Sequence, residues 1–106
     1  MNRRDLLAQH KVLCDEARDL MLLKNKDYAS DDCPFANFSR CEQMGIVSTE
    51  KGFMVRMVDK LSRLLNFIQR EEFSVTDETL KDTTIDLVNY TVLLYAWLHE
   101  KNAKNS

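Results

Sequence analysis

The sequence contains little that would interrupt a helix. Two glycines and one proline occur in 106 residues, and these are the residues that most often end or kink helices. The alternation of apolar and polar residues that marks a half-buried strand is nearly absent as well. We therefore predict an all-α protein, a helical bundle of three long helices plus one short helix that is completed by homo-oligomerisation. Residues 1–106 form a single domain in this prediction, with residues 102–106 as a frayed tail.

Cysteine and excess charge are also scarce, which excludes several classes of protein. Cys14, Cys33 and Cys41 are odd in number and match no CxxC spacing, so we expect reduced thiols in a cytoplasmic protein and no structural zinc. A net charge of -2 and a pI near 5.6 provide no general basic field, so no polymeric nucleic acid is expected as a partner. No apolar run is long enough to cross a membrane, and the N-terminus lacks the apolar core of a signal peptide. No membrane partner is therefore expected.

The short motifs of many enzymes are missing too. The sequence has no P-loop, GxGxxG, GxSxG or HExxH motif. His10 and His99 lack a Cys or His partner at metal-ligand spacing, and we expect both at the surface. The candidate residues therefore come from polar side chains on otherwise apolar helices and from one irregular segment.

Caps and apolar periodicity divide the chain into four expected helices. Asn2 caps the first helix, and Gly45 ends the short second one. Ser48 or Thr49 starts the third helix, and the signature Ser74-Val-Thr-Asp77 starts the fourth. The expected ranges are about 2–24, 36–44, 50–70 and 74–101.

Polar side chains occur where the last helix should be buried. Asp82, Asp86 and Asn89 follow an i, i+4, i+7 spacing and so share one face, although apolar residues cover most sides of this helix. A buried carboxylate costs free energy unless it pairs with a cation or holds a metal ion. The two aspartates therefore need a partner.

A partner for them lies on the preceding long helix. Arg56, Lys60 and Arg63 repeat the i, i+4, i+7 spacing within a mostly apolar run, with Asp59 one step to the side. Two such helices packed side by side would form a polar seam through the core. The seam is either a structural network of salt bridges or the lining of a ligand or metal site, because perturbed charged clusters concentrate at functional sites. The sequence leaves both interpretations open.

The segment from about residue 25 to residue 38 breaks the helical pattern and is rich in polar and aromatic side chains. Long loops in compact domains are often functional. Lysines can contact phosphates, aromatic rings can stack on a base and asparagine can read a base edge, so this composition suits a nucleotide. For Phe35 and Phe38 we favour the structural alternative, in which both rings anchor the segment in the core. The residues assigned to ligand binding here are Lys24, Lys26, Asp27, Tyr28 and Asn37.

Four motifs together resemble a known family. They are Lys24-Asn-Lys-Asp-Tyr28, Pro34-Phe-Ala-Asn-Phe38, Gly52-Phe-Met-Val-Arg-Met-Val-Asp-Lys-Leu-Ser-Arg63 and Asp82-Thr-Thr-Ile-Asp-Leu-Val-Asn-Tyr90. Their combination, which covers about residues 20–95, resembles the small "nucleotide modification associated domain" family, type 1, which is common in phage genomes. The resemblance implies a phage or prophage origin, the host cell cytoplasm as location, and a nucleotide or modified nucleotide as ligand.

The last motif is more distantly similar to the second metal-binding helix of the MazG-type all-α nucleoside triphosphate pyrophosphohydrolases. Those enzymes hold Mg²⁺ with a Glu-x-x-Glu pair on one helix and a Glu-x-x-Asp pair on the next, and a metal-bound water attacks the phosphorus. In this chain Asp82 and Asp86 are four residues apart instead of three, and a Glu-x-x-Glu pair is missing. Asp15, Glu16 and Asp19 on the first helix are the nearest substitute.

Three functions follow from these observations. The first is a Mg²⁺-dependent pyrophosphohydrolase in which Asp59, Asp82 and Asp86 are the catalytic and metal-binding residues. The second is a protein that binds or sequesters a nucleotide without turning it over, which the surplus of cations over carboxylates in the seam favours. The third is a structural helical interaction protein. The ligand-binding residues shared by the first two hypotheses are Lys24, Lys26, Asp27, Tyr28, Asn37, Arg56, Lys60, Arg63 and Asn89.

Overall fold

The computed structural model describes residues 1–28, 34–70 and 79–105, without the side chains of residues 26–28. Within these ranges the chain forms four helices and no strand, which confirms the predicted all-α class. The helices are α1 (Arg3–Tyr28), α2 (Ala36–Gln43), α3 (Thr49–Arg70) and α4 (Leu80–Lys104). None of these helices has an apolar stretch long enough to cross a membrane.

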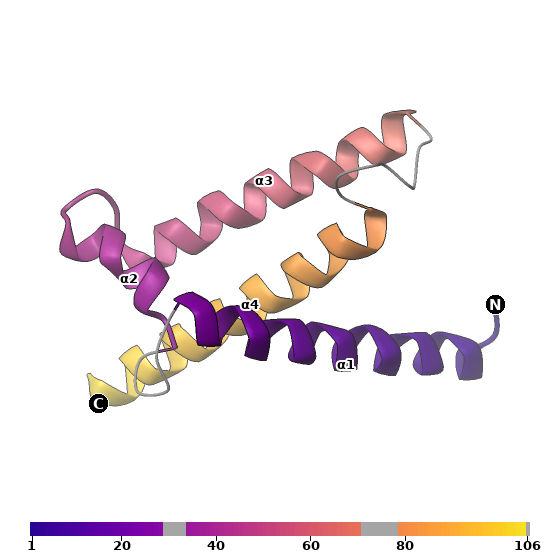
Figure 1. Ribbon diagram of the computed structural model, residues 1–106, viewed down its shortest axis with the longest axis horizontal. Coiled ribbons are helices and arrows are strands. Elements are labelled where there is room, and N and C mark those ends of the chain that lie inside the picture. The colour runs from indigo at the N-terminus through magenta and orange to yellow at the C-terminus, as the bar shows by residue number, and fades with distance from the viewer. Residues whose placement is uncertain (29–33, 71–78, 106) are drawn as a thin grey trace.

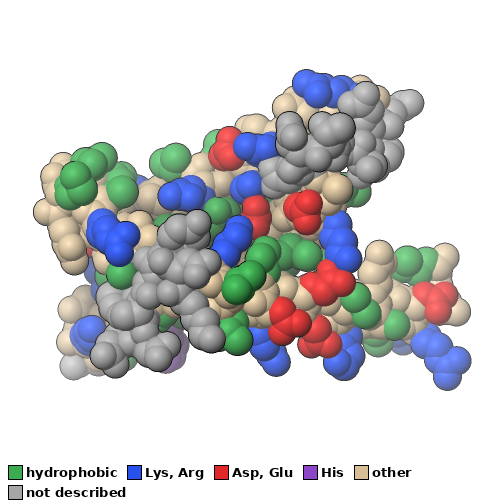
Figure 2. All heavy atoms as spheres, in the orientation of Figure 1, with side chains coloured by type: hydrophobic (Ala, Val, Ile, Leu, Met, Phe, Trp, Pro, Cys, Tyr) green, Lys and Arg blue, Asp and Glu red, His purple; other side chains and the backbone are tan. Residues whose placement is uncertain are grey.

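The helices pack around α4. α3 and α4 lie side by side and run in opposite directions, and α1 packs on another side of α4 (Figure 1). The short α2 packs against α3. The N-terminal half of α1 extends beyond the other helices, and residues 1–12 are exposed. Hydrophobic side chains are consequently visible along this part of α1, and others lie over the loop between α2 and α3 (Figure 2).

Hydrogen bonds at the helix ends match two predicted caps. The side chains of Asn2 and Ser48 each accept a hydrogen bond from the backbone amide three residues on, at 2.9 and 3.3 Å. Both residues thus satisfy amide groups that have no partner within the first turn of a helix. α2 ends at Gln43, and Gly45 follows with a φ of 75°, a conformation that residues with a side chain rarely adopt. This glycine allows the chain to turn toward α3.

α1 is longer than the sequence pattern predicted. The prediction ended this helix at Lys24, whereas α1 continues through Tyr28. The added residues, Asn25-Lys-Asp-Tyr, include neither glycine nor proline, so their polar composition does not prevent helix formation. The prediction that Lys26, Asp27 and Tyr28 belong to an irregular segment is therefore wrong. Their side chains lie outside the described residues.

α4 begins later than predicted. Thr79 is extended, with φ −87° and ψ 166°, and Leu80 is the first helical residue. The Thr79 hydroxyl accepts a hydrogen bond from the Asp82 amide at 3.1 Å, and the Asp82 carboxylate accepts one from the Thr79 amide at 3.3 Å. This reciprocal pair is a capping box. The predicted start, Ser74-Val-Thr-Asp77, has the same Ser/Thr-x-x-Asp pattern and lies outside the described residues.

The buried core is aromatic and lies where α2 meets α3 and α4. Phe35, Phe38 and Phe53 are buried, which confirms that the first two anchor this part of the chain. The rings of Phe38 and Phe53 stack with their centroids 4.2 Å apart, and Phe35 meets Trp97 edge-on at 5.4 Å. The partly buried residues of α4 around these rings are Tyr90, Leu93, Leu94, Ala96 and Trp97.

A charged contact joins the beginning of α3 to the end of α4. One carboxylate oxygen of Glu50 accepts hydrogen bonds from the Trp97 ring nitrogen at 2.6 Å and from the Lys101 ammonium group at 2.9 Å. The Trp97 hydrogen bond, followed by that of Lys101, lowers the pKa of Glu50 from 4.5 to about 2. Because the folded pKa lies below the unfolded one, this contact stabilises the protein above pH 4.5 and loses that effect as the pH falls toward 2.

We expect Glu50→Gln to remove this pH dependence. At neutral pH the substitution should lower the free energy of unfolding by about 1–3 kcal/mol, and the difference from the wild type should vanish as the pH approaches the folded pKa. The lower end of that range allows for the 23% exposure of the Glu50 side chain. Urea unfolding at a series of pH values, followed by the fluorescence of Trp97, the single tryptophan, measures the difference.

The control for this experiment is Asp15, whose exposed carboxylate pairs with Lys11 at 2.7 Å; the hydrogen bond from Lys11 lowers its pKa. Asp15→Asn should leave the pH dependence nearly unchanged because solvent screens this pair. A difference between Glu50→Gln and the wild type that stays constant from neutral to acidic pH would contradict the role assigned to Glu50.

Candidate functional site

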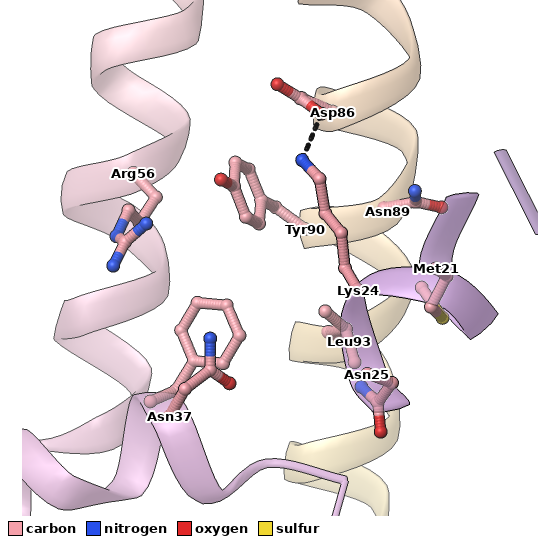
Figure 3. Close-up of a pocket in the computed structure, with 10 residues that line it drawn as sticks. Met21, Lys24, Asn25, Asn37, Arg56, Asp86, Asn89, Tyr90 and Leu93 are labelled. Atoms are coloured by element: carbon pink, nitrogen blue, oxygen red, sulfur yellow. Dashed lines mark ion pairs between the residues drawn. The ribbon is translucent and has the colours of Figure 1, made fainter. Parts of the chain in front are cut away.

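The helices border a pocket near the middle of α4. Its volume is about 450 Å³, which lies within the range of small-molecule sites. Figure 3 shows α3 on one side of the pocket, α1 and α4 on the other, and α2 at the lower end of the view. The lining residues are Met21, Lys24, Asn25, Asn37, Phe38, Arg56, Asp86, Asn89, Tyr90 and Leu93.

Asp86 forms the charged centre of the pocket. Its carboxylate lies 2.9 Å from the Lys60 ammonium group of α3 and 3.5 Å from the Lys24 ammonium group of α1 (Figure 3 marks the second pair). The side chains of Asp86 and Lys60 are only 13% and 14% exposed, whereas Lys24 is half exposed. Two cations from two helices therefore surround one carboxylate, and the cluster carries a net positive charge.

An aromatic wall lies beside this charged cluster. Phe38 meets Tyr90 edge-on, with centroids 6.1 Å apart, and Phe53 supports the Phe38 ring by stacking on it. The Arg56 guanidinium carbon lies 5.7 Å from the centre of the Phe38 ring, which is a cation–π distance. The pocket thus combines a fixed ring surface with a third cation.

Side-chain amides from three helices complete the lining. Asn89 of α4 is buried, and its amide nitrogen donates a hydrogen bond to the Ala17 carbonyl of α1 at 3.0 Å. Asn25 donates one to the Pro34 carbonyl at 3.2 Å. These two asparagines therefore hold parts of the fold together and also border the pocket, while Asn37 reaches the pocket from α2.

The structure brings part of the predicted site together. Lys60 lies at the edge of the pocket through its ion pair with Asp86. The predicted residues that line the pocket itself are Lys24, Asn37, Arg56, Asp86 and Asn89. Among the described residues, the predicted seam between α3 and α4 contains the ion pair Lys60–Asp86, to which α1 adds Lys24.

Other predicted residues lie elsewhere. Asp59 pairs with Arg63 of the same helix at 3.4 Å, and both side chains are about half exposed or more. Asp82 forms the capping box of α4 and is exposed. Within residues 1–28, 34–70 and 79–105, no group of three or more His, Cys, Asp or Glu side chains is close enough to hold a metal ion. Asp86 is thus the one member of the predicted metal-binding set that lines the pocket.

Sequence reasoning missed several lining residues, although a pattern pointed to some of them. Asp86, Tyr90 and Leu93 follow the i, i+4, i+7 spacing of one helix face, and Met21 and Asn25 are four residues apart on α1. In the prediction Asp86 was instead paired with Asp82, which is acidic as well and lies four residues before it. Phe38 was predicted to be a core residue only. Its ring stacks on Phe53 in the core, and Phe38 also lines the pocket.

No protein-family model, curated protein or solved structure matches the chain. The resemblance to the nucleotide modification associated domain family, and the more distant one to MazG-type enzymes, therefore stay hypotheses that rest on the sequence motifs.

Proposed function

We propose that the pocket binds a nucleotide or a modified nucleotide without requiring a metal ion. One observation carries the proposal: Asp86, the sole carboxylate among the described lining residues, is already paired with two lysines, and Arg56 adds another cation beside an aromatic ring. Such a site has more positive charge than its own carboxylate neutralises, so it favours an anionic ligand over a metal cation.

The cations suit the phosphate groups of such a ligand. Lys24 and Lys60 contact Asp86, and a phosphate beside them would share these ammonium groups with the carboxylate. The Arg56 guanidinium can donate to two phosphate oxygens at once. These interactions need no bound metal.

The rest of the wall suits a nucleobase. Phe38 and Tyr90 provide ring surface for stacking, and the Asn37 amide provides a donor and an acceptor for a base edge. A volume of about 450 Å³ is sufficient for a small ligand of mononucleotide size.

A second candidate function is the Mg²⁺-dependent pyrophosphohydrolase. The observation that favours it is the position of Asp86 next to the cations where phosphates would bind. Mg²⁺ is often held by one or two carboxylates together with substrate phosphates and water. In this proposal Asp86 would bind the ion and orient it toward the substrate, whereas Asp59 and Asp82 have contacts outside the pocket.

A thermal-shift screen separates the two functions. Nucleoside mono-, di- and triphosphates and cyclic nucleotides are each tested with Mg²⁺ and with EDTA. A ligand at a hundredfold excess over Kd stabilises the protein by about 2.7 kcal/mol, which such a screen detects. We expect a shift that persists in EDTA. A shift confined to triphosphates with Mg²⁺ would support hydrolysis, and no shift with any nucleotide would contradict both functions in favour of a structural role.

Arg56→Gln should weaken nucleotide binding about tenfold, which corresponds to about 1.4 kcal/mol, because it removes one charge-assisted contact to phosphate. Arg56 is exposed, so the fold should be retained. The matched control is Arg63→Gln on the same helix. Arg63 pairs with Asp59 and is not among the lining residues, so the affinity of this variant should equal that of the wild type. Isothermal titration calorimetry of both variants measures the difference. Equal weakening in the two variants would show a general charge effect and contradict the assigned site.

The remaining sequence-based predictions belong to the same proposal. A cytoplasmic location is favoured by the three cysteines, of which Cys14 and Cys41 are free thiols. A phage or prophage origin rests on the resemblance alone. A homo-oligomer is favoured by the apolar residues exposed on the long helices.

A further inference from the structure

One face of α3 is apolar and covered by nothing in the described structure. We call it the outer stripe; it consists of Met54, Val58, Leu61, Leu65 and Ile68, which are 48%, 56%, 53%, 53% and 65% exposed. The steps between these residues are four, three, four and three. This alternation is the heptad spacing with which one helix packs along another.

The outer stripe is also free of charge. Val55, Ser62 and Gln69 border it along one side, and neither they nor the stripe residues are ionisable. The charged residues of the same segment lie on other sides of the helix at 100° per residue. An exposed apolar face of about four turns without a charged side chain is typical of a surface that another helix covers.

The surface area of the whole chain, to which the exposed half of α1 also contributes, leaves enough area for such a partner. The protein exposes 8076 Å², whereas a monomeric globular protein of 12.4 kDa exposes about 6100 Å². Its radius of gyration is 15.7 Å, compared with about 13 Å for a compact domain of this length. The excess of roughly 2000 Å² exceeds the area of about 800 Å² that each partner loses in a stable interface.

The spacing of the outer stripe is symmetric about its middle residue, which suits a second copy of this chain as the partner. Leu61 is the midpoint: Met54 and Ile68 lie seven residues before and after it, and Val58 and Leu65 lie three and four residues away. A two-fold axis at Leu61 would place each end of the stripe opposite the other end in the partner. Such an interface is isologous and needs no second kind of surface.

We propose that two copies pair through the outer stripe of α3, antiparallel and about a two-fold axis at Leu61. Arg56 is two positions from Met54 and therefore lies about 200° around the helix, where it faces the pocket. The pocket stays open in both copies. The dimer and the nucleotide site are thus independent, and either can be disproved without the other.

Analytical ultracentrifugation of the full chain tests the dimer. The wild type is expected to sediment at twice 12.4 kDa and Leu61→Glu at 12.4 kDa, because the two-fold axis brings two buried carboxylates together. The control is Val12→Glu, which changes a residue of α1 with nearly the same exposure, 54% against 53% for Leu61, on a side of α1 that faces away from buried Ala17. It should remain dimeric. A monomeric wild type, or a dimeric Leu61→Glu protein, would overturn the proposal.

Two further experiments test the symmetry and guard against misfolded variants. Because residue 61 of one copy faces residue 61 of the other, an equimolar mixture of Leu61→Glu and Leu61→Lys should form a dimer that neither variant forms alone. A mixture that stays monomeric would overturn the two-fold axis.

Oxidative cross-linking should join Met54→Cys to Ile68→Cys when the two variants are mixed. Met54→Cys alone should not cross-link to itself through position 54, and if it does, the pairing is parallel and the proposed arrangement is wrong.

Discussion

Replacing Phe53 with alanine is expected to lower the free energy of unfolding by about 3–5 kcal/mol. Phe53 is 0% exposed, and its ring stacks on Phe38 with the centroids 4.2 Å apart. The substitution removes buried apolar area and leaves a cavity at the place where α2, α3 and α4 meet. Domains are stable by only about 5–15 kcal/mol, so this change should remove a large part of the total.

Urea unfolding followed by Trp97 fluorescence and by circular dichroism measures the effect as a lower midpoint. Leu23→Ala is the control, because Leu23 of α1 is 60% exposed and should change the stability by less than about 0.5 kcal/mol. Phe53→Leu keeps more of the side-chain volume and should fall between the two. Equal effects of Phe53→Ala and Leu23→Ala would contradict the position of the core.

The second large effect is expected at Asp86. Asp86→Asn neutralises a carboxylate that is 13% exposed and lies 2.9 Å from the Lys60 ammonium group. Because this pair is largely shielded from solvent, its loss should lower the free energy of unfolding by about 2–4 kcal/mol at neutral pH. The same substitution should strengthen nucleotide binding in EDTA several-fold, since it removes the charge that repels a phosphate. Stability and affinity should therefore change in opposite directions.

The control is Asp59→Asn on α3. Asp59 is 61% exposed and pairs with Arg63 at the surface, so the substitution should cost about 0–0.5 kcal/mol and leave binding unchanged. Urea unfolding and titration calorimetry in EDTA provide the two measurements. If Asp86→Asn weakens binding, and if binding by the wild type requires Mg²⁺, then Asp86 is a metal ligand and the metal-independent proposal is wrong.

The sequence was sufficient to predict the helical class and several local contacts. The scarcity of glycine and proline and the apolar periodicity do not depend on tertiary structure, and neither do the caps at Asn2 and Ser48, which bond to amides three residues away. The ends of a helix were harder to predict where the sequence contains more than one capping signature. Two Ser/Thr-x-x-Asp signatures precede the last helix, and the later one, Thr79 with Asp82, is the cap of α4.

The prediction of the site depended on where α4 begins. Once Asp82 is the third residue of the helix, its carboxylate bonds to the Thr79 amide, and of the two aspartates it is Asp86 that pairs with the neighbouring helices. The contribution of α1 could not be predicted either. The face that α1 turns toward α4 is decided by packing between segments distant in the sequence, and spacing within α1 does not contain that information.

The hydrogen bond between Asn89 and Ala17 has a consequence for the order in which the helices pack during folding. It joins positions 72 residues apart, whereas α3 packs on α2 and α4, the helices that precede and follow it along the chain. Closing a long loop costs more entropy than closing a short one, so we expect α3 to pair with α4 first and α1 to dock last. The pocket takes Lys24 from α1 and Asp86 from α4, and it exists only after this final step. A chain in which α1 has not docked therefore lacks the complete pocket, so we expect any ligand of the pocket to stabilise only the fully folded molecule.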